Sequence, residues 1–246
     1  MCIRDRDFAR DAKARAVRPL LIRRREGDPE SDTVRRAILV DTQSGEMAVR
    51  TIGDPSELQL NALVDEPVAA FGATMTDPIF LVCTNGKRDA CCALRGRILA
   101  AALAPDHAEQ TWECTHLGGH RFAGNLVCLP DGIVYGRVTP NDGPRLADAY
   151  LAGNLDPELL RGRSAWPAPA QVAERELRLR LGLDGVADVT LAGVEADTDR
   201  ARVALAAGGT THTLELVAER LAPPRPTSCR ADEMEEPLHW RVLEVG

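Results

Sequence analysis

The stretch "PIFLVCTNGKRDACCALRGRILAAALA", Pro78–Ala104, decides the fold of this chain. It opens with a continuous apolar run that ends at Cys83, which is typical of a buried strand. A polar loop follows, and the apolar positions from Cys91 to about Ala104 predict a helix. Because "QTWEC", Gln110–Cys114, predicts a second strand, the segment indicates a strand–helix–strand unit of the α/β class.

The flanking sequence predicts further strands and helices on both sides of this unit. We expect strands at residues 18–25, 35–42, 46–52, 125–130, 133–138, 187–194, 201–206 and 211–217, and helices at 56–72, 143–154, 157–164 and 171–181. Asp131-Gly132 is a strong hairpin signal between two of the strands. "WPAPA", residues 166–170, is expected to be a linker.

These elements divide the chain into three expected parts. They are an N-terminal α+β segment (1–75), a central domain (76–163) and a C-terminal α+β segment of unknown role (168–246). The opening "MCIRDR", Met1–Arg6, looks like translated sequencing-adapter sequence, so we expect the natural chain to begin further upstream.

Composition excludes several classes of function. The 246 residues carry a formal net charge of −7, which gives no electrostatic case for binding nucleic acid or an anionic membrane. No apolar run approaches the roughly 18 residues of a membrane helix, and no signal-peptide pattern appears. We therefore expect a cytoplasmic protein. The scarcity of lysine beside arginine and alanine suggests a GC-rich bacterial genome.

Two cysteines and two histidines form the candidate metal site. Cys83 ends the first strand and Cys92 lies at the start of the helix, where the helix dipole and free N–H groups stabilise anionic sulfur. Lys87 and Arg88 add positive charge in the loop between them. His116 and His120 flank Gly118-Gly119, whose glycines disfavour a helix and let the backbone approach a bound group.

These residues leave several chemistries open. A zinc protease needs glutamate after the first histidine, and Leu117 stands there, so this class is excluded. A structural zinc site could use two cysteines and two histidines, although zinc modules usually space their cysteines more closely. A thiol oxidoreductase could use Cys91 or Cys92, but adjacent cysteines do not form a C-x-x-C pair. A [2Fe–2S] cluster with mixed cysteine and histidine ligation is the remaining hypothesis.

"LVCTNGKRDACCALRGR" and "WECTHLGGHRFAGNLVCLPDGIVYGR" resemble the signature segments of the sucrase/ferredoxin-like family, and "PRPTSC" resembles its tail. The resemblance implies a thioredoxin-like ferredoxin core with flanking α+β segments. It also implies a [2Fe–2S] cluster with Cys83 and Cys92 on one iron and His116 and His120 on the other, with Cys91 as an alternative ligand. Cys114 and Cys128 then become neighbouring or core residues, and Cys229 is expected to be incidental.

The family resemblance also implies a role. The protein would carry single electrons between unidentified redox partner proteins, and would not act on a substrate of its own. Neither the partners nor the oligomeric state follows from the sequence.

Histidine ligation leads to a first prediction. An imidazole N–H that faces solvent loses its proton more readily when the bound irons are oxidised, so reduction is expected to take up a proton. The midpoint potential should then fall as pH rises between about 6 and 10, which potentiometric titration measures. A potential that is constant over this range would contradict proton coupling.

Overall fold

The computed structural model describes residues 3–25, 27, 35–87, 89–229 and 231–245. Its α-helices are α1 (Ile3–Ala14), α2 (Leu60–Asp65), α3 (Val68–Phe71), α4 (Ala90–His107), α5 (Asp142–Leu151) and α6 (Ala168–Leu181), and its 3-10 helices are η1 (Pro55–Glu57), η2 (His120–Phe122) and η3 (Val186–Asp188). Its strands are β1 (Ile22–Arg23), β2 (Arg35–Asp41), β3 (Glu46–Ile52), β4 (Ala73–Thr74), β5 (Ile79–Cys83), β6 (Thr111–Cys114), β7 (Leu126–Leu129), β8 (Ile133–Tyr135), β9 (Leu160–Arg163), β10 (Val189–Ala196), β11 (Arg200–Ala207), β12 (Thr210–Arg220), β13 (Arg225–Pro226), β14 (Met234–Glu235) and β15 (Leu238–Val245).

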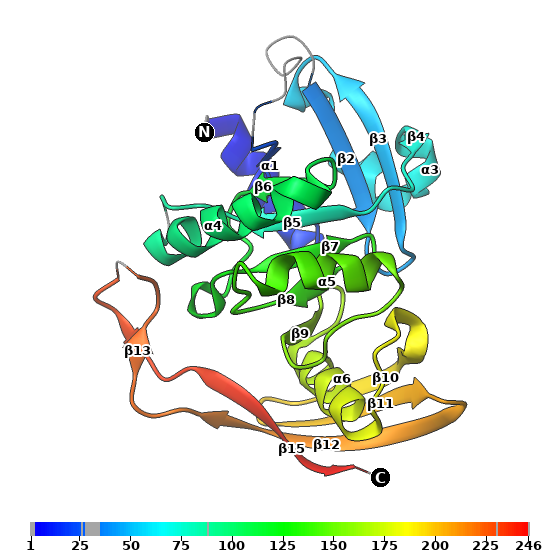
Figure 1. The fold of residues 1–246 in the computed structure, drawn as a ribbon, viewed down its shortest axis with the longest axis vertical. Helices are drawn as coiled ribbons and strands as arrows, with labels where there is room; N and C mark the ends of the chain where they lie inside the picture. The colour runs from blue at the N-terminus through cyan, green and yellow to red at the C-terminus, as the bar shows by residue number, and fades with distance from the viewer. Residues whose placement is uncertain (1–2, 26, 28–34, 88, 230, 246) are drawn as a thin grey trace.

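A six-stranded mixed sheet forms the centre of the molecule, in the order β1-β6-β5-β7-β8-β9 (Figure 1). β5 and β6 are parallel, as a connection through α4 requires, and β5, β7, β8 and β9 follow one another antiparallel. In chain order, the centre consists of a strand–helix–strand unit followed by a hairpin and a helix. The predicted α/β class is confirmed.

Both faces of the central sheet are covered. Phe80 and Val82 of β5 pack with α4 and α5, whereas Ile79 and Leu81, one residue out of step, point to the opposite side. On that opposite side Met47 and its neighbours from the β2-β3-β4 sheet complete a second apolar cluster. A strand buried on both faces has no polar side to alternate with, which explains the unbroken apolar run of β5.

The C-terminal region forms its own antiparallel sheet, in the order β10-β11-β12-β15, with α6 packed on it (Figure 1). Between β12 and β15 the chain makes a separate excursion in which β13 pairs with β14. The strands predicted at 187–194, 201–206 and 211–217 are therefore present, as β10, β11 and β12. The proposed boundaries between the three parts of the chain stay predictions.

Two sequence-based assignments are wrong. Residues 157–164 were expected to be helical, but Leu160–Arg163 is strand β9, because Leu160 fills the core beside Tyr135 and Gly162 takes a φ of +118°. The expected linker 166–170 is also different: Pro167 caps α6, which begins at Ala168. Pro at the first turn of a helix has no N–H to lose, so the proline-rich stretch starts a helix.

Within the described part of the chain, none of the helices combines the length and the apolar character that crossing a bilayer requires.

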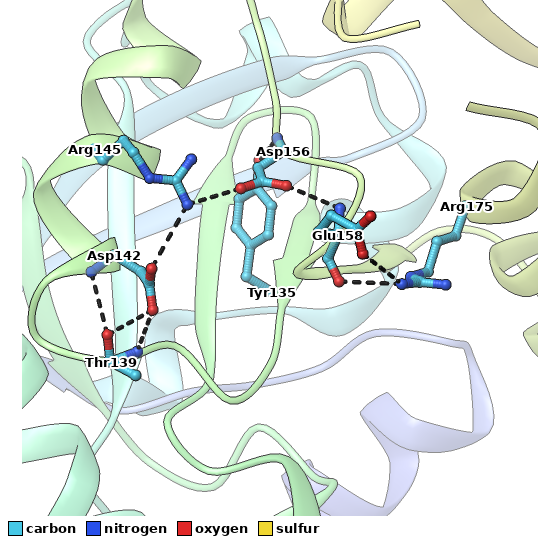
Figure 2. A network of polar contacts seen from close by, with 7 residues as sticks. All are labelled: Tyr135, Thr139, Asp142, Arg145, Asp156, Glu158 and Arg175. Carbon is cyan, nitrogen blue, oxygen red and sulfur yellow. Dashed lines mark hydrogen bonds and ion pairs between the residues drawn. The ribbon is translucent and has the colours of Figure 1, made fainter. Parts of the chain in front are cut away.

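A polar network fixes the segment that connects α5 to β9 (Figure 2). Asp142 accepts hydrogen bonds from the backbone N–H and the hydroxyl of Thr139 at the start of α5. Arg145, one turn later, forms ion pairs with Asp142 and with Asp156, at 3.6 and 2.7 Å. The backbone N–H of Asp156 donates to the hydroxyl of buried Tyr135. The network therefore ties the helix to the sheet it covers.

The Thr139 hydrogen bonds and the nearby Arg145 lower the pKa of Asp142. A carboxyl whose pKa is lowered by folding stabilises the native state above its unfolded pKa of about 3.9, and this stability is lost as pH falls through the folded value. We expect Asp142→Asn to lower the free energy of unfolding by about 1 kcal/mol at pH 7, and by progressively less below pH ~4. Urea unfolding across pH tests this, with the exposed Asp106→Asn on α4 as control. If the loss in free energy of unfolding did not change with pH, the effect would come from altered packing and not from the charge of Asp142.

Candidate metal centre

The strand–loop–helix unit brings two buried thiols together. Cys83 ends β5 and Cys92 lies in the first turn of α4, and each is 1% exposed. Their sulfur atoms and one ring nitrogen of His116 all lie within 4.8 Å of one another. Three of the four predicted ligands therefore meet at one point.

Gly96 makes this meeting possible. It lies one turn after Cys92 in α4, where a Cβ atom would come within 2.0 Å of the Cys83 carbonyl oxygen. Real Cβ atoms do not approach so closely, so only glycine lets the helix lie against the end of β5. A glycine inside a helix costs about 1 kcal/mol relative to alanine. Its presence in "CCALRGR" was the sequence signal for this close packing, and sequence reasoning missed it.

The histidine loop follows β6. Gly118 and Gly119 have φ values of +84° and +66°, in the left-handed region that favours glycine. Arg18 donates a hydrogen bond of 2.9 Å to the backbone carbonyl of His116, which holds the loop on its outer side. What approaches Gly119 most closely is the Arg161 guanidinium, 2.8 Å from where a Cβ would stand.

His120 lies apart from the other three candidate ligands. It begins the 3-10 helix η2 and is half-buried, and among the described residues it is not part of the group that Cys83, Cys92 and His116 form. It lines a surface pocket together with Thr227 and Glu235 from the C-terminal excursion. The structure thus places His120 on the edge of the site, beneath a segment far away in sequence.

Asp89 is a site residue that sequence reasoning missed. An aspartate directly before a helix is typical of an N-cap, but the Asp89 side chain makes no capping hydrogen bond to α4. The buried carboxylate instead places Oδ2 3.9 Å from His116 Nδ1, and its Oδ1 accepts a 2.8 Å hydrogen bond from the backbone N–H of Cys229. A carboxylate beside a histidine is a common means of orienting a metal-binding imidazole.

Cys91 and Cys114 pack in the same apolar cluster as the thiol pair, whereas Cys128 lies in the cluster on the other face of the sheet. Burial raises the pKa of Cys92, and the neighbouring Cys83 raises it further. Burial, with a contribution from Cys229, raises the pKa of Cys91 to about 11. Cys114 and Cys128 are buried, as expected of core residues. Since a metal binds the deprotonated thiolate, a bound cation would offset the cost of charging the buried sulfurs of Cys83 and Cys92.

Lys87 and Arg88, the two basic residues of the loop 84–89, were predicted to lie beside the metal. Lys87 is exposed, and its backbone N–H donates to the Asn85 side chain as in an ordinary polar turn. Arg88 lies outside the described residues. A role for either beside the metal stays a prediction.

Three arginines distant in sequence bring positive charge to the histidine loop. Arg161 donates to the Asn125 side chain and lies over the Phe122 ring, which Arg137 also contacts. Burial lowers the pKa of Arg161, and neighbouring Arg18 and Arg137 lower it further. Among the described residues, none of the three is ion-paired with a carboxylate. A chain of net charge −7 thus presents unneutralised positive charge beside His116 and His120.

This arrangement can bind a metal through sulfur and nitrogen. Two buried thiols and an imidazole are ligands for zinc and for iron–sulfur clusters, and a poor set for magnesium or calcium, which take oxygen ligands.

The contact at Gly96 gives a testable prediction. Gly96→Ala should push α4 away from β5 and lower the free energy of unfolding by roughly 1–3 kcal/mol, despite the better helix propensity of alanine. Gly193→Ala in β10 is a matched control, because a Cβ there meets nothing within 4 Å. Denaturant unfolding measures both, and equal stability of the two variants would contradict the importance of this contact.

Comparison with known proteins shows which family the chain belongs to. A family model described as sucrase/ferredoxin-like matches residues 20–162, which is more than half of the chain. A solved thioredoxin-like [2Fe–2S] ferredoxin from Aquifex aeolicus is similar at 19% identity over 38% of this chain and 97% of its own, with a TM-score of 0.33.

Three curated relatives are fungal, and each is named altered inheritance of mitochondria protein 32. The protein from Meyerozyma guilliermondii is 34% identical over 88 residues, 31% of this chain and 31% of its own length. That from Debaryomyces hansenii is 30% identical, over 34% and 35%. That from Candida glabrata is 24% identical, over 48% and 36%. The chain spans about a third of the length of these relatives, and a bacterial source stays a prediction. On the family match, the chain is a member of the sucrase/ferredoxin-like family.

Proposed function

We propose that this protein binds a [2Fe–2S] cluster and carries single electrons between partner proteins. The observation that supports this most is the meeting of Cys83, Cys92 and His116 within 4.8 Å, in a chain of the sucrase/ferredoxin-like family. In this proposal the protein is an electron carrier and not an enzyme with its own substrate.

The donor chemistry fits such a cluster. Cys83 and Cys92 would hold one iron, and His116 and His120 the other, with Cys91 as the alternative to Cys92. The two thiols are withdrawn from water, whereas the half-buried histidines lie toward the surface. When bound, the cluster would supply reversible one-electron chemistry at a potential that imidazole ligation raises relative to four thiolates.

The chain's own residues would orient and tune this site. The Asp89 carboxylate lies beside His116 and would favour one orientation of its ring. Arg18 donates to the backbone carbonyl of His116. Arg161 acts on the loop through Asn125, whose amide donates to the backbone carbonyl of Gly119. The positive charge of both arginines would favour the more negative reduced state.

The arginines would also influence which redox partner protein binds. Arg18 and Arg137 are exposed beside the histidine loop, so a redox partner with an acidic surface would be drawn to the edge where His120 lies. A cytoplasmic setting belongs to the same proposal. Its support is that the six described cysteines are free, as expected where thiols are kept reduced.

Zinc is the alternative metal, because three sulfur and nitrogen donors this close also suit a tetrahedral ion. The protein would then be a zinc-stabilised binding module without a redox role. A thiol oxidoreductase that uses Cys91 or Cys92 is the third hypothesis. It predicts disulfide exchange activity that survives loss of both histidines.

Spectroscopy of the purified protein separates these functions. We expect about two irons and two sulfides per chain, visible absorption, and an electron paramagnetic resonance signal on reduction. His116→Cys and His120→Cys should retain the cluster but lower its midpoint potential, by on the order of 100 mV each, because thiolate replaces imidazole.

The matched controls use other cysteines of the same region. Cys83→Ala and Cys92→Ala should lose the iron, whereas Cys128→Ala, equally buried but in β7, should retain it. Retention of iron in Cys92→Ala with its loss in Cys91→Ala would reassign the ligand. A colourless protein with one zinc per chain after anaerobic purification would contradict the cluster.

A further inference from the structure

The excursion between β12 and β15 forms an arm that lies on the candidate metal centre. We define this C-terminal arm as the described residues 225–229 and 231–235, which include β13, labelled in Figure 1, and its partner strand β14. Glu235 forms an ion pair with Arg121, the residue after His120. Thr227 and Glu235 line one pocket with Gly119 and His120. The arm thus covers the His120 edge of the site, although more than a hundred residues separate the two in sequence.

Cys229 lies at the turn of this arm, directly over Cys91. Its sulfur is 2.8 Å from the sulfur of Cys91. Its backbone N–H donates to Oδ1 of the buried Asp89, which fixes the position of the turn. The two thiols therefore lie in contact without any rearrangement of the chain.

We infer that Cys91 and Cys229 are a redox-active dithiol, which a low-molecular-weight disulfide such as oxidised glutathione converts to an intrachain disulfide. Cys229 is exposed and reacts first: it loses its proton, and its sulfur attacks oxidised glutathione to give a mixed disulfide and one reduced glutathione. Cys91 then loses its proton and attacks the Cys229 sulfur, which releases the second glutathione. Two protein thiols are oxidised to one disulfide, and one glutathione disulfide is reduced to two thiols.

The disulfide would fasten the arm over the edge of the site that holds His120. In the reduced protein, the contacts at Asp89 and Arg121 hold the arm only by reversible polar interactions. A covalent link would keep the arm closed and limit access to His120. Oxidation of the surrounding thiol pool would in this way reduce the accessibility of the metal centre. This inference goes beyond the proposed function: with Cys92 as the cluster ligand, Cys91 can form the disulfide whether or not a cluster is bound.

The same residues could instead bind a metal ion, and the experiment below distinguishes this from the disulfide. One oxygen of Asp89 and the sulfurs of Cys91 and Cys229 also lie within 4.8 Å of one another, as a metal ion would require. Two sulfurs 2.8 Å apart, one of them open to solvent, favour the disulfide.

The experiment treats the purified full chain with oxidised glutathione, blocks remaining thiols with N-ethylmaleimide, and digests with trypsin without reduction. Trypsin leaves Cys91 in peptide 89–95 and Cys229 in peptide 221–230. We expect these peptides to be joined, with the loss of two hydrogens, and to separate on addition of dithiothreitol. The joined pair should disappear in Cys91→Ser and in Cys229→Ser, and it should persist in Cys128→Ser.

Cys83→Ser separates this inference from the proposed function. It should retain the joined peptides while losing the cluster, so that failure of one proposal leaves the other standing. Glutathione attached to Cys229 with no joined pair would overturn the inference. So would pairing of Cys91 with Cys92, or thiols that resist oxidation until a chelator removes bound zinc.

Discussion

The contact between Gly96 and the Cys83 carbonyl is the constraint on which the site depends. Eight residues separate Cys83 from Cys92, and a strand and a helix can bring them together only if the helix starts against the strand's end. Without a Cβ at residue 96, α4 reaches that position, and Leu99 then fills the core beneath the sheet. Since packed interiors leave few voids, the same contact that joins the thiols also sets the depth of the helix on the sheet.

Elements with a strong local signal could be predicted from the sequence. β5 and β7 are unbroken apolar runs, and Asp131-Gly132 marks the hairpin after β7. β9 could not be found in this way. Its four residues are too few to distinguish a strand from a helix by pattern. They form a strand where Leu160 packs beside Tyr135 at the edge of the central sheet. Tertiary packing decided that element, and local propensity misled.

The residues of the candidate site likewise fall into those that local sequence motifs indicate and those that only the structure identifies. Cys83, Cys92 and His116 stand in two compact motifs, and their chemistry together with the family resemblance suggested that they meet. Asp89 was hidden, because its position before a helix imitates an N-cap. Arg161 and Cys229 were hidden by distance along the chain: each belongs to a different segment, and nothing in its neighbours indicates the surface that it contacts.

The C-terminal region gains a physical role from the same contacts. An arm can cover His120 only if its root is held in place relative to the central sheet. Glu174 and Arg178 of α6 are fully buried, and Glu174 also pairs with Arg163 of β9, so charged groups join the helix to the edge of that sheet. Such a buried pair is costly to separate, because each partner would be left as an uncompensated charge. The network thus gives β12 and β15 a fixed base, from which the arm carries Cys229 to Cys91.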